Sequence, residues 1–154
     1  MLEVGHKPAD FTLPTDDGEL SWSSLRGKPV VLFFYPRADT PGCTTESIDF
    51  TQRYGDFQAL GVEVIGGSAD SVKAQCKFRD KHGLGVRLLS DPDHVILEPW
   101  GVWGEKTLYG RKSMGIIRTT LVFDADGVLV HRWNRVRVKG HVDKVYDKVA
   151  ELFG

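Results

Sequence analysis

The sequence predicts an α/β fold in which a largely parallel sheet is covered on both faces. Between residues 30 and 91, apolar runs typical of strands alternate with segments of helical spacing, in the order β-α-β-α-β. Residues 116–133 contain two β-rich runs joined by a polar turn, which predicts a hairpin. The 154 residues show no internal repeat or linker. We therefore expect a single domain over residues 1–154.

The N-terminal part of the chain predicts an arm followed by a buried strand. Residues 1–28 are mixed in character, and the Asp-Asp-Gly turn at residues 16–18 predicts a short hairpin or an extended arm. The run VVLFFY at residues 30–35 is continuously apolar and rich in β-branched and aromatic side chains. Such a run is typical of a strand that is buried on both faces.

Two helices follow, with a second buried strand between them. Residues 40–60 have helical spacing, and Gly61 is suited to end this helix. Residues 62–70 predict a strand because they are apolar and end in small and polar residues. The next helix covers residues 71–83, opens with a capping serine or aspartate and closes at a glycine.

The C-terminal part predicts antiparallel strands and a last helix. Residues 86–91 predict a strand, and the segment after it predicts a short helix that breaks at Pro99. The hairpin of residues 116–133 turns at residues 124–127. The last helix, residues 141–153, is amphipathic. Its expected apolar stripe is Val142, Val145, Val149 and Leu152.

Composition and charge exclude several classes of protein. The hydrophobic fraction is 41%, the charged fraction 27% and the formal net charge −1, which gives no general bias toward nucleic acid or anionic membranes. No apolar run approaches the roughly 20 residues that span a bilayer, and the N-terminus does not read as a signal peptide. We therefore expect a cytoplasmic protein. The five histidines are scattered, so we expect no metal site.

Cys43, one of two cysteines, lies at the expected start of a helix. Thr40 is suited to the N-cap, Pro41 to the first helical position, and Gly42 permits close approach of the backbone. The sulfur of Cys43 then lies near unpaired backbone N–H groups and the positive end of the helix dipole. This setting favours the nucleophilic thiolate over the thiol. The alternative is that Cys43 is a small apolar residue of the core.

The segment YPRADTPGCTTE resembles the active-site segment of peroxiredoxins, in the bacterioferritin comigratory protein or PrxQ branch. The segments GHKPADFTLPTDDGE, GGSADS, LLSDPD and WGVWGEKTLYGRKSMGIIRTTLVFDADG also resemble family segments, in the same order. The resemblance implies a thioredoxin-like fold, a central mixed sheet flanked by helices, with an N-terminal β extension. It also implies reduction of hydrogen peroxide and organic hydroperoxides by a cysteine, without a metal or an organic cofactor.

The resemblance also assigns site residues. The family's proline, threonine and peroxidatic cysteine fall on Pro36, Thr40 and Cys43, and its arginine falls on Arg118. Arg118 is permanently cationic and can stabilise the thiolate and the charge that develops during attack on the peroxide. The hydroxyl of Thr40 can accept a proton from the peroxide or donate one to it. Pro36 screens the sulfur from water and shapes the loop.

The second cysteine leaves two catalytic cycles open. Many members of the branch carry a second cysteine five residues after the first, where this chain has Ile48. Other members carry the resolving cysteine in the following helix, where this chain has Cys76. If Phe78 marks the core face of that helix, Cys76 points outward and is available; if Val72 marks it, Cys76 is buried. Without a resolving cysteine, an outside thiol reduces the sulfenic acid directly.

We therefore expect a monomeric thiol peroxidase that acts on peroxides and is regenerated by thioredoxin or a glutaredoxin-like reductant, with no nucleic-acid or membrane partner. One alternative is a non-catalytic thiol switch on the same fold. A weaker alternative is a binding module that uses the basic segment of residues 131–141. There Arg135, Arg137 and Lys139 share a strand parity with Trp133, although a solvated strand face explains this pattern more simply.

Overall fold

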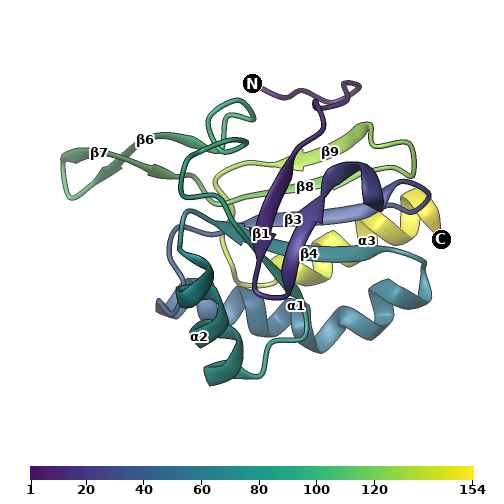
Figure 1. Cartoon of the computed structure of the whole chain (residues 1–154), viewed down its shortest axis with the longest axis horizontal. Helices are drawn as coiled ribbons and strands as arrows, with labels where there is room; N and C mark the ends of the chain where they lie inside the picture. The colour runs from purple at the N-terminus through teal and green to yellow at the C-terminus, as the bar shows by residue number, and fades with distance from the viewer.

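The computed structural model describes residues 1–154, apart from the side chain of Leu108. Its described part contains a seven-stranded sheet, a separate two-stranded hairpin and three α-helices (Figure 1). The strands of the large sheet are β1 (Thr12–Thr15), β2 (Gly18–Ser21), β3 (Val30–Phe34), β4 (Glu63–Ser68), β5 (Arg87–Ser90), β8 (Thr119–Phe123) and β9 (Leu129–Trp133). The hairpin is β6 (Trp103–Leu108) and β7 (Arg111–Ile116). The helices are α1 (Pro41–Ala59), α2 (Val72–His82) and α3 (His141–Phe153), and a 3₁₀ turn, η1, covers Trp22–Leu25.

The large sheet is mixed, and only its centre is parallel. The strand order is β2-β1-β5-β4-β3-β8-β9, in which β3, β4 and β5 run parallel and all the other pairings are antiparallel. The expectation of a largely parallel sheet, drawn from the alternation of strands and helices, was therefore wrong. The mixed sheet with an N-terminal β extension that the family resemblance implies is confirmed.

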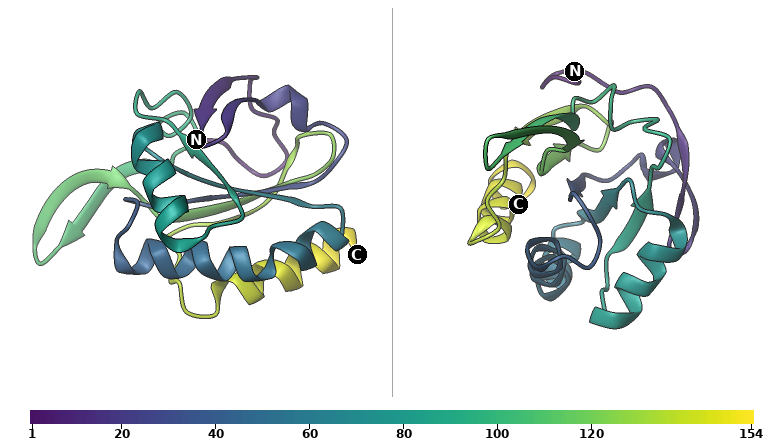
Figure 2. Two further views of the ribbon diagram at one scale, coloured as in Figure 1. Left: turned by 60° about the horizontal axis from the view of Figure 1, so that its bottom comes forward. Right: turned by 90° about the vertical axis from the view of Figure 1, so that its left-hand side faces the viewer.

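The three helices cover one face of this sheet. The crossovers β3-α1-β4 and β4-α2-β5 step in the same direction along the sheet, so right-handed connections place both helices on the same side. Helix α3 packs beside α1 (Figure 2). Side chains of all three helices share one apolar cluster with Val31, Phe33 and Val122 of the sheet.

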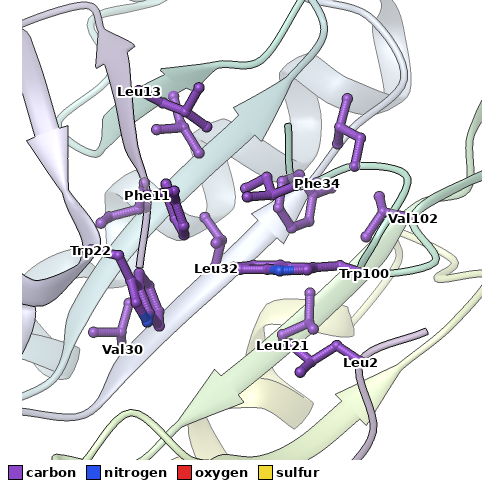
Figure 3. Close-up of a cluster of buried hydrophobic side chains, with 14 of the residues drawn as sticks. Leu2, Phe11, Leu13, Trp22, Val30, Leu32, Phe34, Trp100, Val102 and Leu121 are labelled. Atoms are coloured by element: carbon purple, nitrogen blue, oxygen red, sulfur yellow. The ribbon is translucent and has the colours of Figure 1, made fainter. Parts of the chain in front are cut away.

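Irregular segments cover the opposite face. There the N-terminal arm, η1 and residues 96–102 bury Leu32, Phe34 and Leu121 in a second apolar cluster (Figure 3). The indole of Trp22 packs within this cluster, with its ring centroid 4.7 Å from that of Phe123. The sheet is thus buried on both sides, which explains why β3 is continuously apolar.

The caps that the sequence predicts for α2 are confirmed. Ser71 is the N-cap, and its hydroxyl accepts a hydrogen bond from the backbone N–H of Ala74 at 3.2 Å. Gly83 ends the helix in the left-handed conformation, with φ of 62°. Helix α1 ends at Ala59, and Gly61 follows with φ of 75°.

The predicted short helix after residue 91 was wrong. Residues 92–101 form a series of turns that is organised by the buried carboxylate of Asp91. This carboxylate accepts hydrogen bonds from the backbone N–H groups of Val95, Ile96 and Leu97. Because the side chain of Asp91 satisfies these amides, the segment reaches the core through successive turns instead of a continuous helix.

Two further expectations near the C-terminus need correction. Val142, Val145 and Val149 are buried as predicted, but Leu152 is 39% exposed and the last turn packs through Phe153 instead. The basic segment is not one strand face, because β9 ends at Trp133 and the residues that follow are irregular.

The hairpin β6-β7 extends away from the body of the molecule (Figure 1), and the sequence analysis missed it. Its loop is the dipeptide Tyr109-Gly110, in which both residues have positive φ, 50° and 75°. A two-residue turn with positive φ at both positions matches the twist of the paired strands in a hairpin. Residues 111–114 of β7 are all exposed, so this strand lacks the apolar alternation by which strands are recognised.

His141, at the start of α3, is a buried titratable group beside the apolar cluster that the three helices share. It is 4% exposed, its Nε2 atom lies 2.8 Å from the Thr120 hydroxyl, and its ring packs edge-on against Phe50. Burial, helped by the positive charges of Lys144 and Arg118, lowers the pKa of His141 to about 4. The folded protein therefore holds a neutral imidazole over a pH range in which the unfolded chain binds a proton.

We expect the free energy of unfolding to fall as the pH falls from about 6.5 to about 4, since the unfolded state binds the extra proton there. The contribution of His141 is about 1–3 kcal/mol, fully present above pH 6.5. Urea unfolding of the wild type and of His141→Gln at about pH 7.5 and about pH 5 isolates it. An identical pH dependence in the two proteins would contradict the assignment.

Candidate active site

The loop between β3 and α1 positions the first predicted site residues. Tyr35 is fully buried at the end of β3, and the chain then turns outward at Pro36. Thr40 is the N-cap residue of α1, with extended backbone angles (φ −97°, ψ 156°), and Pro41 occupies the first turn. This arrangement places Cys43 within the first turn of α1, with its side chain 1% exposed. The predicted helix start is confirmed.

Arg118 contacts the sulfur although it lies 75 residues after Cys43 in the sequence. It lies directly before β8, and its Nη2 donates to Cys43 Sγ at 3.3 Å, while its Nη1 donates to Glu46 Oε1 at 2.7 Å. One guanidinium thus joins the cysteine and a carboxylate on the same helix. A Cβ atom at Gly42 would lie 3.3 Å from Arg118 Nη2, so the glycine leaves room for this approach.

Glu46 is a member of the site that sequence reasoning missed. Its side chain is fully buried, and among the described residues its Oε2 atom has no hydrogen-bond partner. Burial raises the pKa of Glu46 to about 7, although the charge of Arg118 acts to lower it. The sequence does carry a signal, because residues three apart on a helix share a face and Glu46 is three residues after Cys43.

The Thr40 hydroxyl is not used to cap the helix. It donates to the backbone carbonyl oxygen of Arg37 at 2.8 Å, and α1 has no side-chain cap. The first-turn amides of the helix are therefore not occupied by this side chain. With its own proton committed to Arg37, the Thr40 oxygen has lone pairs left to accept a hydrogen bond from a ligand.

Asp39 fastens the same loop to α2. It has φ of 62°, a conformation that is uncommon for residues other than glycine. Its carboxylate accepts from Lys81 Nζ at 2.9 Å and lies 2.8 Å from His82 Nε2. These hydrogen bonds, first from His82 and then from Lys81, lower the pKa of the Asp39 carboxyl. The two contacts connect the loop before α1 to the C-terminal end of α2.

Pro36 lines a cavity of about 550 Å³ between the loop and the β6-β7 hairpin. Its other walls include Trp103, Met114 and Ile116, which are apolar, and the side chain of Lys106. Burial and the nearby charge of Arg118 lower the pKa of Lys106, whereas the charge of Cys43 acts to raise it. The cavity is therefore a mainly apolar space whose charged lining residues are Arg37, Asp70 and Lys106.

Cys76 is the predicted site residue that the structure does not bring to Cys43. Phe78 marks the core face of α2, and Cys76 is half-buried on a neighbouring face, where its thiol donates to the carbonyl oxygen of Asp16 at 3.6 Å. Both cysteines are free thiols. To form a disulfide with each other, the two sulfurs have to leave their present partners, Asp16 and Arg118.

The arrangement is suited to nucleophilic attack on an electrophile that develops negative charge. The Cys43 sulfur lies at the positive end of a helix dipole and accepts a hydrogen bond from a guanidinium, so positive potential from two sources meets at this atom. The same donors can stabilise charge on an atom that approaches the sulfur, because they are already oriented toward it.

Comparison with known proteins agrees with this chemistry. Residues 4–132 match the model of the AhpC/TSA family. A putative peroxiredoxin Bcp from Coxiella burnetii is 46% identical over 149 residues, which cover 96% of this chain and 99% of that protein. Peroxiredoxin Bcp from Bacillus subtilis is 40% identical over 152 residues, which cover 98% and 97%.

Solved structures give the same result at the level of the fold. The bacterioferritin comigratory protein of Xanthomonas campestris, studied for its alkyl peroxide reduction activity, superimposes with a TM-score of 0.91 at 34% identity and covers 100% of this chain and 99% of its own. PrxQ from Xylella fastidiosa gives 0.93 at 29% identity and covers 98% and 97%. The predicted thioredoxin-like fold is thereby confirmed. The chain belongs to the AhpC/TSA family, in its peroxiredoxin Bcp/PrxQ branch, and is a thiol peroxidase.

Proposed function

We propose that Cys43 is the peroxidatic cysteine, that Arg118, Thr40 and Pro36 complete its site, and that Cys76 resolves the oxidised enzyme. The observation that carries the proposal is the contact of 3.3 Å between Arg118 Nη2 and Cys43 Sγ at the start of α1. Two fixed sources of positive potential meet at this one sulfur, the helix dipole and the guanidinium.

In the first step, the Cys43 thiolate attacks one peroxide oxygen and the O–O bond breaks. The sulfur is oxidised by two electrons to a sulfenic acid, and the other oxygen takes a proton and leaves as water or an alcohol. The Arg118 guanidinium stabilises the negative charge as it spreads over sulfur and both oxygens. The Thr40 oxygen, whose own proton is donated to Arg37, accepts the hydrogen bond of the peroxide.

The substrates are hydrogen peroxide and organic hydroperoxides. The cavity of about 550 Å³ beside Pro36 supports the second group, because its apolar walls of Trp103, Met114 and Ile116 can bury a hydrocarbon substituent. The bacterioferritin comigratory protein of Xanthomonas campestris, which this chain resembles, is described as reducing alkyl peroxides.

In the second step, the Cys76 thiol attacks the Cys43 sulfenic acid, which gives a disulfide and releases water. A dithiol reductant of the thioredoxin or glutaredoxin type then restores both thiols. We propose that the protein acts as a monomer in the cytoplasm, since a reducing compartment maintains the two free thiols that the cycle needs. Among the described helices, none is long and apolar enough to cross a membrane.

Intact mass spectrometry after one equivalent of peroxide tests the role of Cys76. We expect the wild type to lose two hydrogens, as in an internal disulfide, and Cys76→Ser to gain one oxygen, as in a sulfenic acid that has no partner. Ser71→Ala, at the exposed N-cap of the same helix, is the control and should still form the disulfide. A wild type that also gains an oxygen would show that an outside thiol reduces Cys43 directly.

A further inference from the structure

A chain of buried hydrogen bonds joins the helix of Cys76 to the catalytic loop. Its centre is Gln75, the residue before Cys76, whose side chain is fully buried. The hydroxyl of Tyr35 donates to Gln75 Oε1 at 2.6 Å. Gln75 Nε2 donates to Ser68 Oγ at 3.1 Å and to the carbonyl oxygen of Leu89 at 2.9 Å. One amide of α2 thus bonds to the ends of β3, β4 and β5.

The chain continues from Ser68 into the loop that carries Pro36 and Thr40. Ser68 Oγ donates to Asp70 Oδ2 at 2.6 Å, and the same carboxylate oxygen accepts the backbone N–H of Ala38 at 2.7 Å. Ala38 lies midway between Pro36 and Thr40. The backbone N–H of Asp70 also donates to Ser68 Oγ at 3.1 Å, so Ser68 connects Gln75 to the carboxylate that holds Ala38.

The inner half of this chain excludes water, whereas Asp70 and Ala38 are half-buried. Tyr35, Ser68 and Gln75 are at most 1% exposed. Burial raises the pKa of the Tyr35 hydroxyl well above its ordinary value, so it remains a hydrogen-bond donor. A buried polar network is stable when every member is satisfied and is costly when one leaves.

Movement of Cys76 toward Cys43 has to disturb this chain. Unwinding α2 around Cys76 withdraws the neighbouring Gln75 from its three partners. Ser68 then loses a donor, and the Asp70 carboxylate that holds Ala38 loses part of its support. These contacts therefore form a continuous connection between α2 and the loop of residues 36–40.

We propose that Gln75 is a positioning residue that couples the two segments, so that the loop of residues 36–40 is fully assembled only while α2 is folded. A substitution of Gln75 should then change the rates of Cys43 oxidation and of disulfide formation in opposite directions. The consequence for the disulfide rests on the proposed role of Cys76. The coupling itself does not, because it is a property of the reduced protein.

The first test is hydrogen exchange by NMR on reduced protein in a Cys76→Ser background, which cannot form the disulfide. Gln75→Leu keeps most of the side-chain volume and removes the amide; Gln52→Leu, at an exposed position of α1, is the matched control. We expect the amides of α2 and of Ala38 to exchange about ten-fold faster in Gln75→Leu and unchanged in the control. Faster exchange in α2 with an unchanged Ala38 amide would overturn the coupling, and so would no change in either.

The second test follows a single turnover with both cysteines present. In Gln75→Leu we expect oxidation of Cys43 to slow several-fold, because the loop is less ordered, and disulfide formation to accelerate several-fold, because α2 opens more readily. The fraction of Cys43 oxidised beyond the sulfenic acid at high peroxide should fall accordingly. A purely structural role would move both rates in the same direction, and that outcome would overturn the proposal.

Tyr35→Phe provides a milder variant if Gln75→Leu does not fold, since it removes only the hydroxyl from the chain. We expect the same two changes in rate at smaller amplitude. Where Gln75→Leu does fold, adding Tyr35→Phe to it should cause no further change. Additive effects would show that the two side chains act independently. A wild type that forms no disulfide would refute the role of Cys76, while the exchange experiment would still decide the coupling.

Discussion

Cys43→Ser is expected to lower kcat/KM for hydrogen peroxide by about 10⁴-fold or more. A serine hydroxyl fits the space of the buried thiol and can accept the N–H of Arg118, so the fold and the charge around the site are kept. The hydroxyl stays protonated near neutral pH, however, and is a poor nucleophile toward peroxide. The variant therefore isolates the sulfur from the rest of the site.

The measurement is peroxide consumption with a small dithiol as reductant. The wild type should consume many equivalents of peroxide per protein, whereas a thiol switch would stop after one. Cys76→Ser is the control, because it keeps the nucleophile and should complete at least the first oxidation. Residual turnover of Cys43→Ser within ten-fold of the wild type would remove Cys43 from the mechanism.

Local sequence patterns predicted the elements whose ends or burial depend on nearby residues. The caps at Ser71 and Gly83 and the buried strand β3 belong to this group. The β6-β7 hairpin was missed because its exposed strand has no apolar face to reveal its period. The false helix after Asp91 has a different cause: a single carboxylate satisfies three amides, and no residue pattern shows which backbone groups a side chain will reach.

The site residues also fall into two groups, those that the local sequence predicts and those that it does not. The helix start around Cys43 can be read locally, but its partner Arg118 is 75 residues away, and only the family resemblance brought the two together before the structure did. Glu46 was missed although helical spacing places it beside Cys43, because a carboxylate facing the core contradicts the usual pattern. Its presence is explained only by the guanidinium that comes from outside the helix.

Arg118→Met is expected to slow the oxidation of Cys43 by peroxide by about 10²–10³-fold. The methionine removes the guanidinium that contacts the sulfur at 3.3 Å and that is oriented toward the developing charge. Lys106 remains nearby and keeps part of the positive potential, so the effect should be smaller than that of Cys43→Ser. Stopped-flow measurement of the first oxidation separates this step from disulfide formation.

The same substitution should also destabilise the protein, in a way that depends on pH. Arg118 holds the pKa of the buried Glu46 down, so without it that pKa rises further above about 7. A carboxyl whose pKa is raised in the folded state binds more protons there than in the unfolded state. The free energy of unfolding therefore falls as the pH increases. We expect a loss of about 3–5 kcal/mol in the free energy of unfolding above neutral pH and a smaller loss at about pH 6.

Adding Glu46→Gln to Arg118→Met separates the two effects. The double variant no longer buries an unpaired charge, so it should recover most of the stability, but the oxidation of Cys43 should stay slow because the guanidinium is still absent. Arg132→Met is the matched control: Arg132 is a half-buried arginine that binds the carbonyl oxygens of Leu2, Trp100 and Gly101. It should lose stability without slowing the first oxidation. If the double variant regained the wild-type rate, Arg118 would act on the reaction only by neutralising Glu46, and the direct stabilisation of the thiolate and the transition state would be wrong.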